Sequence, residues 1–185
     1  MRSRGFTLVE LMTVVAILIV LSVVAGGSYR RYLDNARKSE VYGMFAEIRM
    51  KEEAYRAEFS TYLSTAANDT TFCPALGSGT CSGEPCAKSW VGPCATGLGT
   101  PWVQLNLAPG KSMLYCGYTV VAGAPASANP TPAGTYGAAA FSNLSPNNPW
   151  WYAVGTCDND GNLAKNAIFV TTSDKDTVYE QDVHY

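Results

Sequence analysis

The N-terminal apolar run is the feature that most constrains how this chain can fold. From Phe6 to Gly27 the sequence has 22 residues, and Glu10 is the only ionisable side chain among them. As an α-helix this run is about 33 Å long, at about 1.5 Å per residue. The hydrocarbon core of a bilayer is about 30 Å thick. The run therefore predicts a membrane-spanning helix.

Two common targeting segments explain only part of this run. A secretory signal peptide accounts for Arg2 and Arg4 and offers a cleavage site after Ala25, which would release a secreted, disulfide-rich binding module. A signal anchor accounts for the length of the run. Neither explains Glu10, because a carboxylate near the centre of a bilayer costs about 2.5 kcal/mol or more and is by default a functional candidate.

The residues around Glu10 form a recognisable motif. Residues 5–12 read GFTLVELM, which resembles the processing motif of type IV prepilins and their relatives. The resemblance implies that a prepilin peptidase cleaves between Gly5 and Phe6 and removes residues 1–5 as a leader peptide. It also implies that Phe6 becomes N-methylated.

The same resemblance assigns an assembly role to the first residues after the cleavage point. It implies that Phe6, Thr7, Leu8 and Glu10 take part in subunit assembly, with Glu10 attracting the N-terminal amine of a neighbouring subunit. A neighbouring ammonium offsets the cost of an unpaired carboxylate in a helix bundle only when the axial register is right. Such a pair would set the stagger of subunits as well as their affinity.

The function implied by the resemblance is structural and not enzymatic. We expect a subunit of a bacterial type IV pilus, joined to like or different pilins in a filament used for adhesion, motility or DNA uptake. The precursor would be inserted in the inner membrane, with its N-terminus cytoplasmic and its body periplasmic, and assembly machinery there would deliver it to an extracellular pilus. A type II secretion pseudopilin remains an alternative. Many type IV pilins have a proline near residues 26–27 and this chain has none, which weakens the case for an ordinary major pilin and leaves major and minor roles open.

The fold implied is α+β: the type IV pilin fold, in which a long N-terminal helix packs on a C-terminal antiparallel sheet with a long disulfide-rich loop. Residues 28–62 support the amphipathic second half of that helix, since an apolar stripe continues at helical spacing. Its members are Val41, Phe45, Ile48, Tyr55, Phe59 and Tyr62. Glu52 interrupts the stripe, and we expect Glu52 and Glu53 to be solvated. The opposite face carries Glu40, Glu47, Arg49, Lys51, Glu53 and Arg56.

The globular head is expected over residues 63–185. Residues 63–101 are rich in Cys, Gly, Pro and Ser and predict a long loop without regular structure. Residues 102–185 predict an antiparallel sheet and a C-terminal region, with strands at 102–107, 113–121, 135–141, 150–156, 167–172 and 177–183. Residues 158–162 read DNDGN, which predicts the turn of a β-hairpin.

The cysteines predict an oxidising compartment. All six lie in the head, at Cys73, Cys81, Cys86, Cys94, Cys116 and Cys157. Their spacing fits no zinc or redox motif, so an even number behind a membrane-targeting segment indicates disulfides. Six cysteines allow 15 pairings. We favour Cys116–Cys157, because both lie on predicted strands.

Other chemistry finds little support. Asp158, Asp160 and Asn162 alternate like the start of a calcium loop, but the twelfth position of an EF-hand is Phe169 here. A hairpin turn is the preferred interpretation, and no other cofactor is expected. The one histidine, His184, is next to the C-terminus and is a poor candidate for a general base. A net charge of −2 argues against nucleic acid as a general partner.

Overall fold

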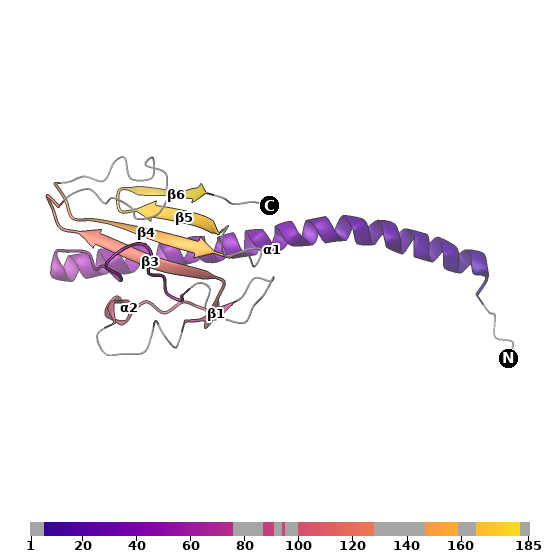
Figure 1. Ribbon diagram of the computed structural model, residues 1–185, viewed down its shortest axis with the longest axis horizontal. Helices are drawn as coiled ribbons and strands as arrows, with labels where there is room; N and C mark the ends of the chain where they lie inside the picture. The colour runs from indigo at the N-terminus through magenta and orange to yellow at the C-terminus, as the bar shows by residue number, and fades with distance from the viewer. Residues whose placement is uncertain are drawn as a thin grey trace. The chain divides into compact units, whose positions relative to one another are not determined.

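A computed structural model describes residues 6–75, 87–90, 94, 100–127, 147–158 and 166–181. The chain divides into two compact units, Met1–Ala36 and Arg37–His184, and each is described by itself. The elements follow in the order α1 (Leu8–Phe59), β1 (Lys88–Ser89), α2 (Pro101–Gln104), β2 (Met113–Leu114), β3 (Cys116–Gly123), β4 (Trp150–Cys157), β5 (Ala167–Thr172) and β6 (Lys175–Gln181) (Figure 1).

The first unit contains the N-terminal part of α1. Two of its hydroxyls bond within the helix: Thr13 and Ser22 donate to the carbonyls of Val9 and Leu18, at 3.1 and 2.7 Å. Within the described residues no helix is both long enough and apolar enough to cross a membrane, so the span expected over residues 6–27 is not confirmed.

The second unit is built on a four-stranded antiparallel sheet. Its strands follow the order β3-β4-β5-β6, so each pairs with its neighbour in the sequence. The pairing of β4 with β5 runs from Tyr152 opposite Thr172 to Cys157 opposite Ala167, which confirms the two strands of the expected hairpin. One face of the sheet packs against the C-terminal part of α1 (Figure 1). A helix followed by an antiparallel sheet with disulfides is the expected α+β layout.

The core lies between α1 and this sheet. Val41, Phe45 and Ile48 are buried against Tyr118 and Trp151. The rings of Phe45 and Tyr118 meet edge to face, with their centroids 6.2 Å apart, an arrangement that aromatic pairs favour. The apolar stripe is therefore confirmed as a core face over its first half. Of its later members, Tyr62 is buried and Tyr55 packs against this core, whereas Phe59 is 53% exposed.

Gly155 on β4 lets the helix and sheet approach each other. A Cβ added there would lie 3.2 Å from Phe45 Cζ, 3.3 Å from Tyr118 Cε1 and 3.3 Å from Val41 Cγ1. Any larger residue would force those core side chains apart, since protein interiors are close-packed.

Several boundaries differ from the sequence expectation. The strand expected at 102–107 is wrong: Pro101 begins the short helix α2, because the fixed φ of proline suits the first helical position. Its buried Trp102 meets Trp90 edge to face, 5.1 Å between centroids. The loop expected over 63–101 contains the two-residue strand β1, which pairs with β2. The strand expected at 113–121 is divided into β2 and β3.

The remaining expected strands either agree closely with the structure or lie outside the described residues. The last strand begins at Lys175, two residues earlier than expected. The strand expected at 135–141 lies outside the described residues, as do Cys81, Cys86 and His184.

Two disulfides fasten the described part of the head. Cys116 on β3 is bonded to Cys157 on β4, with their Cα atoms 4.2 Å apart, the pairing favoured from the sequence. Cys73 is bonded to Cys94, with 5.8 Å between Cα atoms, and closes part of the loop at residues 63–101.

The outer edge of β3 is occupied by the segment that follows α1. Thr65 donates its N–H to the Val120 carbonyl at 2.9 Å and accepts the Val120 N–H on its hydroxyl at 2.8 Å. Ser64 accepts the Ala122 N–H at 2.8 Å. Cys73 and Tyr118 exchange two backbone hydrogen bonds, at 2.8 and 2.9 Å. Side-chain hydroxyls thus take the place of a strand along this edge.

Candidate functional site

The first turn of α1 is closed by a reciprocal pair of side chains. Thr7 accepts the Glu10 N–H on its hydroxyl at 3.3 Å, and Glu10 Oε2 accepts the Thr7 N–H at 2.9 Å. The Thr7 hydroxyl also donates to Glu10 Oε2 at 2.7 Å. This is a capping box, which satisfies two backbone donors that a helix N-terminus otherwise leaves without partners.

The capping box gives Glu10 a partner within its own chain. The spacing Thr-x-x-Glu is a sequence signal for such a box, and the expectations above did not include it. The negative charge also sits at the positive end of the helix dipole, which stabilises it. Glu10 Oε1 makes no hydrogen bond or ion pair with any described residue. One carboxylate oxygen therefore orders the turn while the other is available to a further donor.

Apolar side chains surround this turn and the helix that follows. Their exposed fractions between residues 6 and 23 run from 43% at Val15 to 84% at Phe6. The exposed large apolar residues here are Phe6, Leu8, Val9, Leu11, Met12, Val14, Val15, Ile17, Leu18, Ile19, Val20, Leu21 and Val23. An exposed apolar surface of this extent marks an interaction site.

The expected processing and calcium residues are described only in part. Gly5, Asp160 and Asn162 lie outside the described residues. Asp158 is buried at the end of β4. Within the ranges that the structure describes, no three His, Cys, Asp or Glu side chains gather as a metal site. The hairpin turn expected at residues 158–162, with a calcium loop as its alternative, therefore stays a prediction.

The charged face of α1 contacts the head. Glu40 Oε1 accepts the N–H groups of Tyr115 and Cys116, at 3.1 and 3.3 Å, and the Tyr118 hydroxyl at 3.3 Å. Burial raises the pKa of Glu40, although these hydrogen bonds oppose the rise. Glu47 accepts the Ala108 N–H at 3.2 Å.

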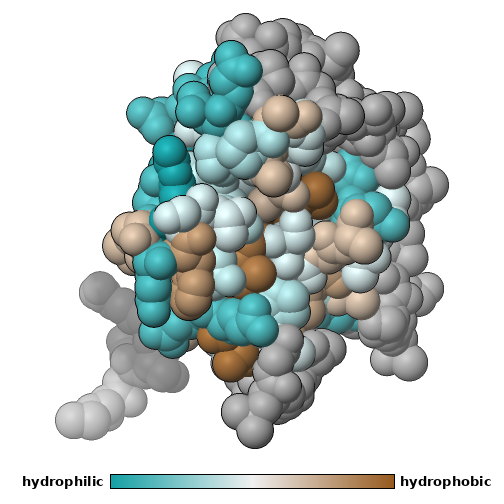
Figure 2. Space-filling view, turned by 90° about the vertical axis from the view of Figure 1, so that its left-hand side faces the viewer, coloured by the Kyte–Doolittle hydropathy of each residue, from teal (hydrophilic) through white to brown (hydrophobic). Residues whose placement is uncertain are grey.

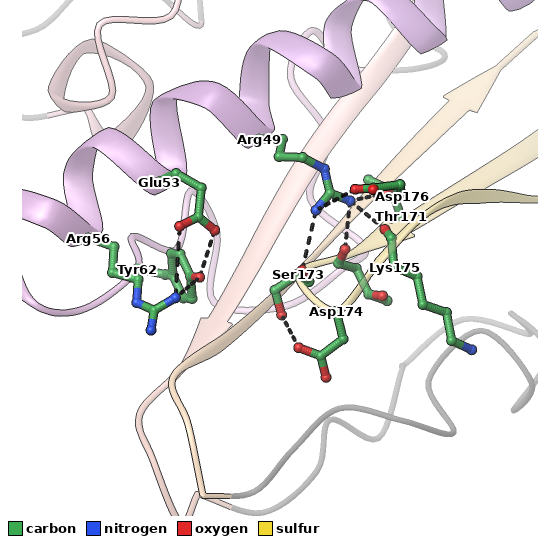
Figure 3. Close-up of polar contacts among 10 residues, drawn as sticks. Arg49, Glu53, Arg56, Tyr62, Thr171, Ser173, Asp174, Lys175 and Asp176 are labelled. Carbon is green, nitrogen blue, oxygen red and sulfur yellow. Dashed lines mark hydrogen bonds and ion pairs between the residues drawn. The ribbon is translucent and has the colours of Figure 1, made fainter.

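Arg49 fixes the turn between β5 and β6. Its guanidinium donates to the carbonyl of Thr172 at 2.8 Å, to the carbonyl of Ser173 at 3.3 Å and to the carbonyl of Lys175. Figure 3 shows the guanidinium in the middle of this turn, with the Asp176 carboxylate beside it. A planar cation with several donors suits a cluster of carbonyls.

The end of α1 carries a second polar group. The Tyr62 hydroxyl donates to Glu53 Oε1 and accepts from Arg56 Nη1, both at 2.8 Å (Figure 3). Burial, followed by the Glu53 hydrogen bond, raises the pKa of Tyr62 to about 12.

Glu52 is the clearest departure from the sequence expectation. Its side chain is fully buried and was expected to be solvated. It accepts the Leu63 N–H at 3.0 Å. Burial, with a smaller contribution from the charge of Glu53, raises its pKa to about 7, although the Leu63 hydrogen bond opposes the rise. The helix face toward the core admits a carboxyl here because the chain folds back over it.

The end of the head at which α1 terminates differs from the N-terminal segment. Figure 2 shows this end, where hydrophobic surface occurs in small areas separated by hydrophilic ones. Most of the large hydrophobic side chains that are exposed in the described part of the chain lie between residues 6 and 23, and the others include Met50, Met113 and Tyr115.

Comparison with known proteins agrees with the site at the N-terminus. Residues 1–26 match the family model described as the prokaryotic N-terminal methylation motif, which confirms the resemblance seen in residues 5–12. The chain is 38% identical over 69 residues to fimbrial protein Q of Moraxella bovis, covering 37% of this chain and 44% of that protein. It is 33% identical over 76 residues to the type IV major pilin protein PilA of Myxococcus xanthus, covering 41% of this chain and 34% of that protein. The matched part thus spans less than half of each relative. No solved structure matches the chain.

Proposed function

We propose that this chain, which carries the N-terminal methylation motif at residues 1–26, is a structural subunit of a type IV pilus. It polymerises with like or different pilins through α1 into an extracellular filament that serves adhesion, motility or DNA uptake. The chain acts as a building block and not as an enzyme.

The observation that carries the proposal is the exposure of the first part of α1. Every large apolar side chain from Phe6 to Val23 is between 43% and 84% exposed. Burying such a surface contributes about 25 cal/mol per Å² relative to water. Among like helices the gain over lipid comes from close packing and polar pairing instead. A filament core supplies both, and head-to-tail contacts that do not close produce a filament.

The geometry of Glu10 supports its proposed role in assembly. Oε2 is occupied by the capping box, and Oε1 is without a partner on any described residue. In the proposed filament Oε1 accepts the N-terminal amine of a neighbouring subunit. The cap fixes the carboxylate at the first turn, so this pair sets the axial register between helices.

Processing precedes assembly in this proposal. The precursor enters the inner membrane with its N-terminus in the cytoplasm and its head in the periplasm, where the disulfides of the head form. A prepilin peptidase cleaves after Gly5 and methylates Phe6, and inner-membrane machinery then adds the subunit to the pilus.

Mass spectrometry of the N-terminal peptide tests the proposal directly. Protein from sheared surface filaments and from membranes is expected to begin at Phe6 and to carry one added methyl group. An N-terminus near Gly26 contradicts the proposal and supports the secreted module instead.

A pair of variants separates the charge of Glu10 from its cap. Glu10→Gln retains a capping-box side chain but removes the charge, and we expect processed protein without filaments. Thr7→Ser retains both and is expected to assemble normally. Normal filaments from Glu10→Gln would show that assembly does not need the charge.

A further inference from the structure

The chain makes a sharp reversal where it leaves α1. The helix ends at Phe59, and Ser60 adopts a left-handed conformation with φ of 59°. The Ser60 N–H still donates to the Arg56 carbonyl at 2.7 Å. Residues 60–65, called the exit strap below, then return across the helix end. Ser64 and Thr65 of the strap hydrogen-bond to β3 as described above.

Glu52 joins α1 to the exit strap. Its side chain is 0% exposed, and Oε2 accepts the Leu63 N–H at 3.0 Å. Oε1 is buried and has no hydrogen-bond partner among the described residues. A buried carboxylate with one unsatisfied oxygen is costly, whereas a neutral carboxyl in the same place costs far less.

The charged neighbours of Glu52 are engaged elsewhere or are repulsive. Arg49, on the preceding turn of α1, binds the β5–β6 turn. Arg56 pairs with Glu53 at 3.8 Å and with the Tyr62 hydroxyl. Glu53 adds a like charge. No ion pair to Glu52 is found in the described ranges.

No charged side chain on the described strands of the sheet forms a hydrogen bond or ion pair with Glu52. Trp151, whose ring meets Tyr62 edge to face at 6.4 Å, is itself fully buried, and its Nε1 has no hydrogen-bond partner among the described residues. An ionised Glu52 must therefore be stabilised by contact with water. The exit strap contacts Glu52 through the Leu63 N–H and contains no helix or strand, so it is the cover that we expect to open.

We propose that Glu52 is a pH-responsive latch: its neutral carboxyl holds the exit strap closed over the helix end, and its ionisation opens the strap and uncovers the edge of β3. The proposal concerns the head alone and does not depend on filament assembly.

The direction of the pH dependence follows from the linkage between the ionisation of Glu52 and the opening of the exit strap. Burial first, and then the charge of Glu53, raises the pKa of Glu52 from 4.5 to about 7. The closed form therefore binds a proton that the open form has lost, and closure weakens as the pH rises from 4.5 to about 7. Below 4.5 the stabilisation is complete, and above about 7 it is lost.

Amide hydrogen exchange measured by NMR on the full chain in detergent micelles tests the latch. We expect the protection factors of Leu63, Thr65 and Val120 to fall by about tenfold per pH unit between about pH 5 and pH 7, and to level off above that range. Glu52→Gln, a neutral side chain of the same shape, is expected to give flat protection. Glu53→Gln is the matched control and is expected to retain the pH dependence.

Two results would overturn the proposal. One is flat protection in the native chain, and the other is an unchanged slope in Glu52→Gln. If Glu52→Gln does not fold, the carboxyl carbon of Glu52 in the native chain is titrated by ¹³C NMR. A midpoint near 7 supports the latch, and one near 4.5 excludes it.

Discussion

The guanidinium of Arg49 lies over the indole of Trp151, 5.2 Å from the ring centroid. The same guanidinium binds the carbonyls of the β5–β6 turn. One side chain of α1 thus contacts both the core of the sheet and its β5–β6 turn. Trp151 is completely buried, so the cation covers an aromatic face that would otherwise meet water.

Replacing Arg49 with Met is therefore expected to destabilise the head by about 2 to 3 kcal/mol, because several carbonyls lose a charged donor and the indole loses its cation. Urea unfolding followed by circular dichroism measures the change. Lys51→Met is the control: Lys51 makes no hydrogen bond or ion pair with the described residues, and its replacement should change stability by less than about 0.5 kcal/mol. Equal effects from the two variants would contradict this role for Arg49.

Two glycines give opposite expectations for the same substitution. Gly155→Ala is expected to cost about 1 to 3 kcal/mol, because Phe45 and Tyr118 are packed against each other and must move apart. Gly43→Ala on α1 meets nothing within 4 Å and should stabilise by about 0.5 to 1 kcal/mol through helix propensity. Thermal unfolding of both variants provides the comparison. A stabilising Gly155→Ala would mean that the interface between helix and sheet is more yielding than its geometry indicates.

Ser60 is a residue with a side chain in a backbone conformation that favours glycine. Ser60→Gly is expected to stabilise by about 0.5 to 1 kcal/mol, since the left-handed conformation costs other residues roughly 1 to 2 kcal/mol. Glu58→Gly, inside the last turn of α1, should lose about 1 kcal/mol. The unfolding midpoints of the two variants are measured side by side, and midpoints that shift in the same direction would contradict this prediction.

The contacts of Glu180 on β6 predict that the head loses stability at acid pH. Burial raises the pKa of Glu180, but hydrogen bonds from Tyr42 and Lys38 and the charge of Lys38 outweigh it and bring the pKa below 4.5. A lowered pKa means that the stabilisation is present above 4.5 and is lost as the pH falls through the folded value. Glu180→Gln should lose about 1 kcal/mol at pH 7 and show a shallower decline in acid.

The control for this acid-dependent loss of stability is Glu58→Gln, which removes an exposed carboxylate that makes no hydrogen bond or ion pair with the described residues. It should leave the pH profile unchanged. If Glu180→Gln and the native chain declined in parallel below pH 4.5, the ion pair with Lys38 would not be the source of the acid-dependent loss.

The sequence predicts those parts of the fold in which burial repeats at a fixed period. Val41, Phe45 and Ile48 lie at helical spacing and are all buried. The strands β4 and β5 were predicted closely because their apolar residues are continuous and bounded by turn residues. Residues 102–107 alternate in polarity like a strand, but Pro101 starts a helical turn there and tertiary packing of Trp102 retains it.

The burial and contacts of polar residues were harder to predict, because a charged residue in a sequence is expected to be solvent-exposed wherever it occurs. Glu52 is buried by a strap that lies beyond the helix, and Glu40 binds backbone donors 75 and 76 residues away. No local pattern contains such contacts. The capping box of Thr7 and Glu10, by contrast, was visible in the spacing.

The occupied edge of β3 has a consequence for a chain proposed to polymerise. Unpaired strand edges recruit other strands, and that is the route to aggregation and amyloid. Crowding many copies together raises this hazard in proportion to their local concentration. While the exit strap is closed, Thr65 and Cys73 use the hydrogen-bonding groups of Val120 and Tyr118, so β3 cannot template a foreign strand at these positions. The chain can therefore polymerise through its helices without also associating through the edge of its sheet.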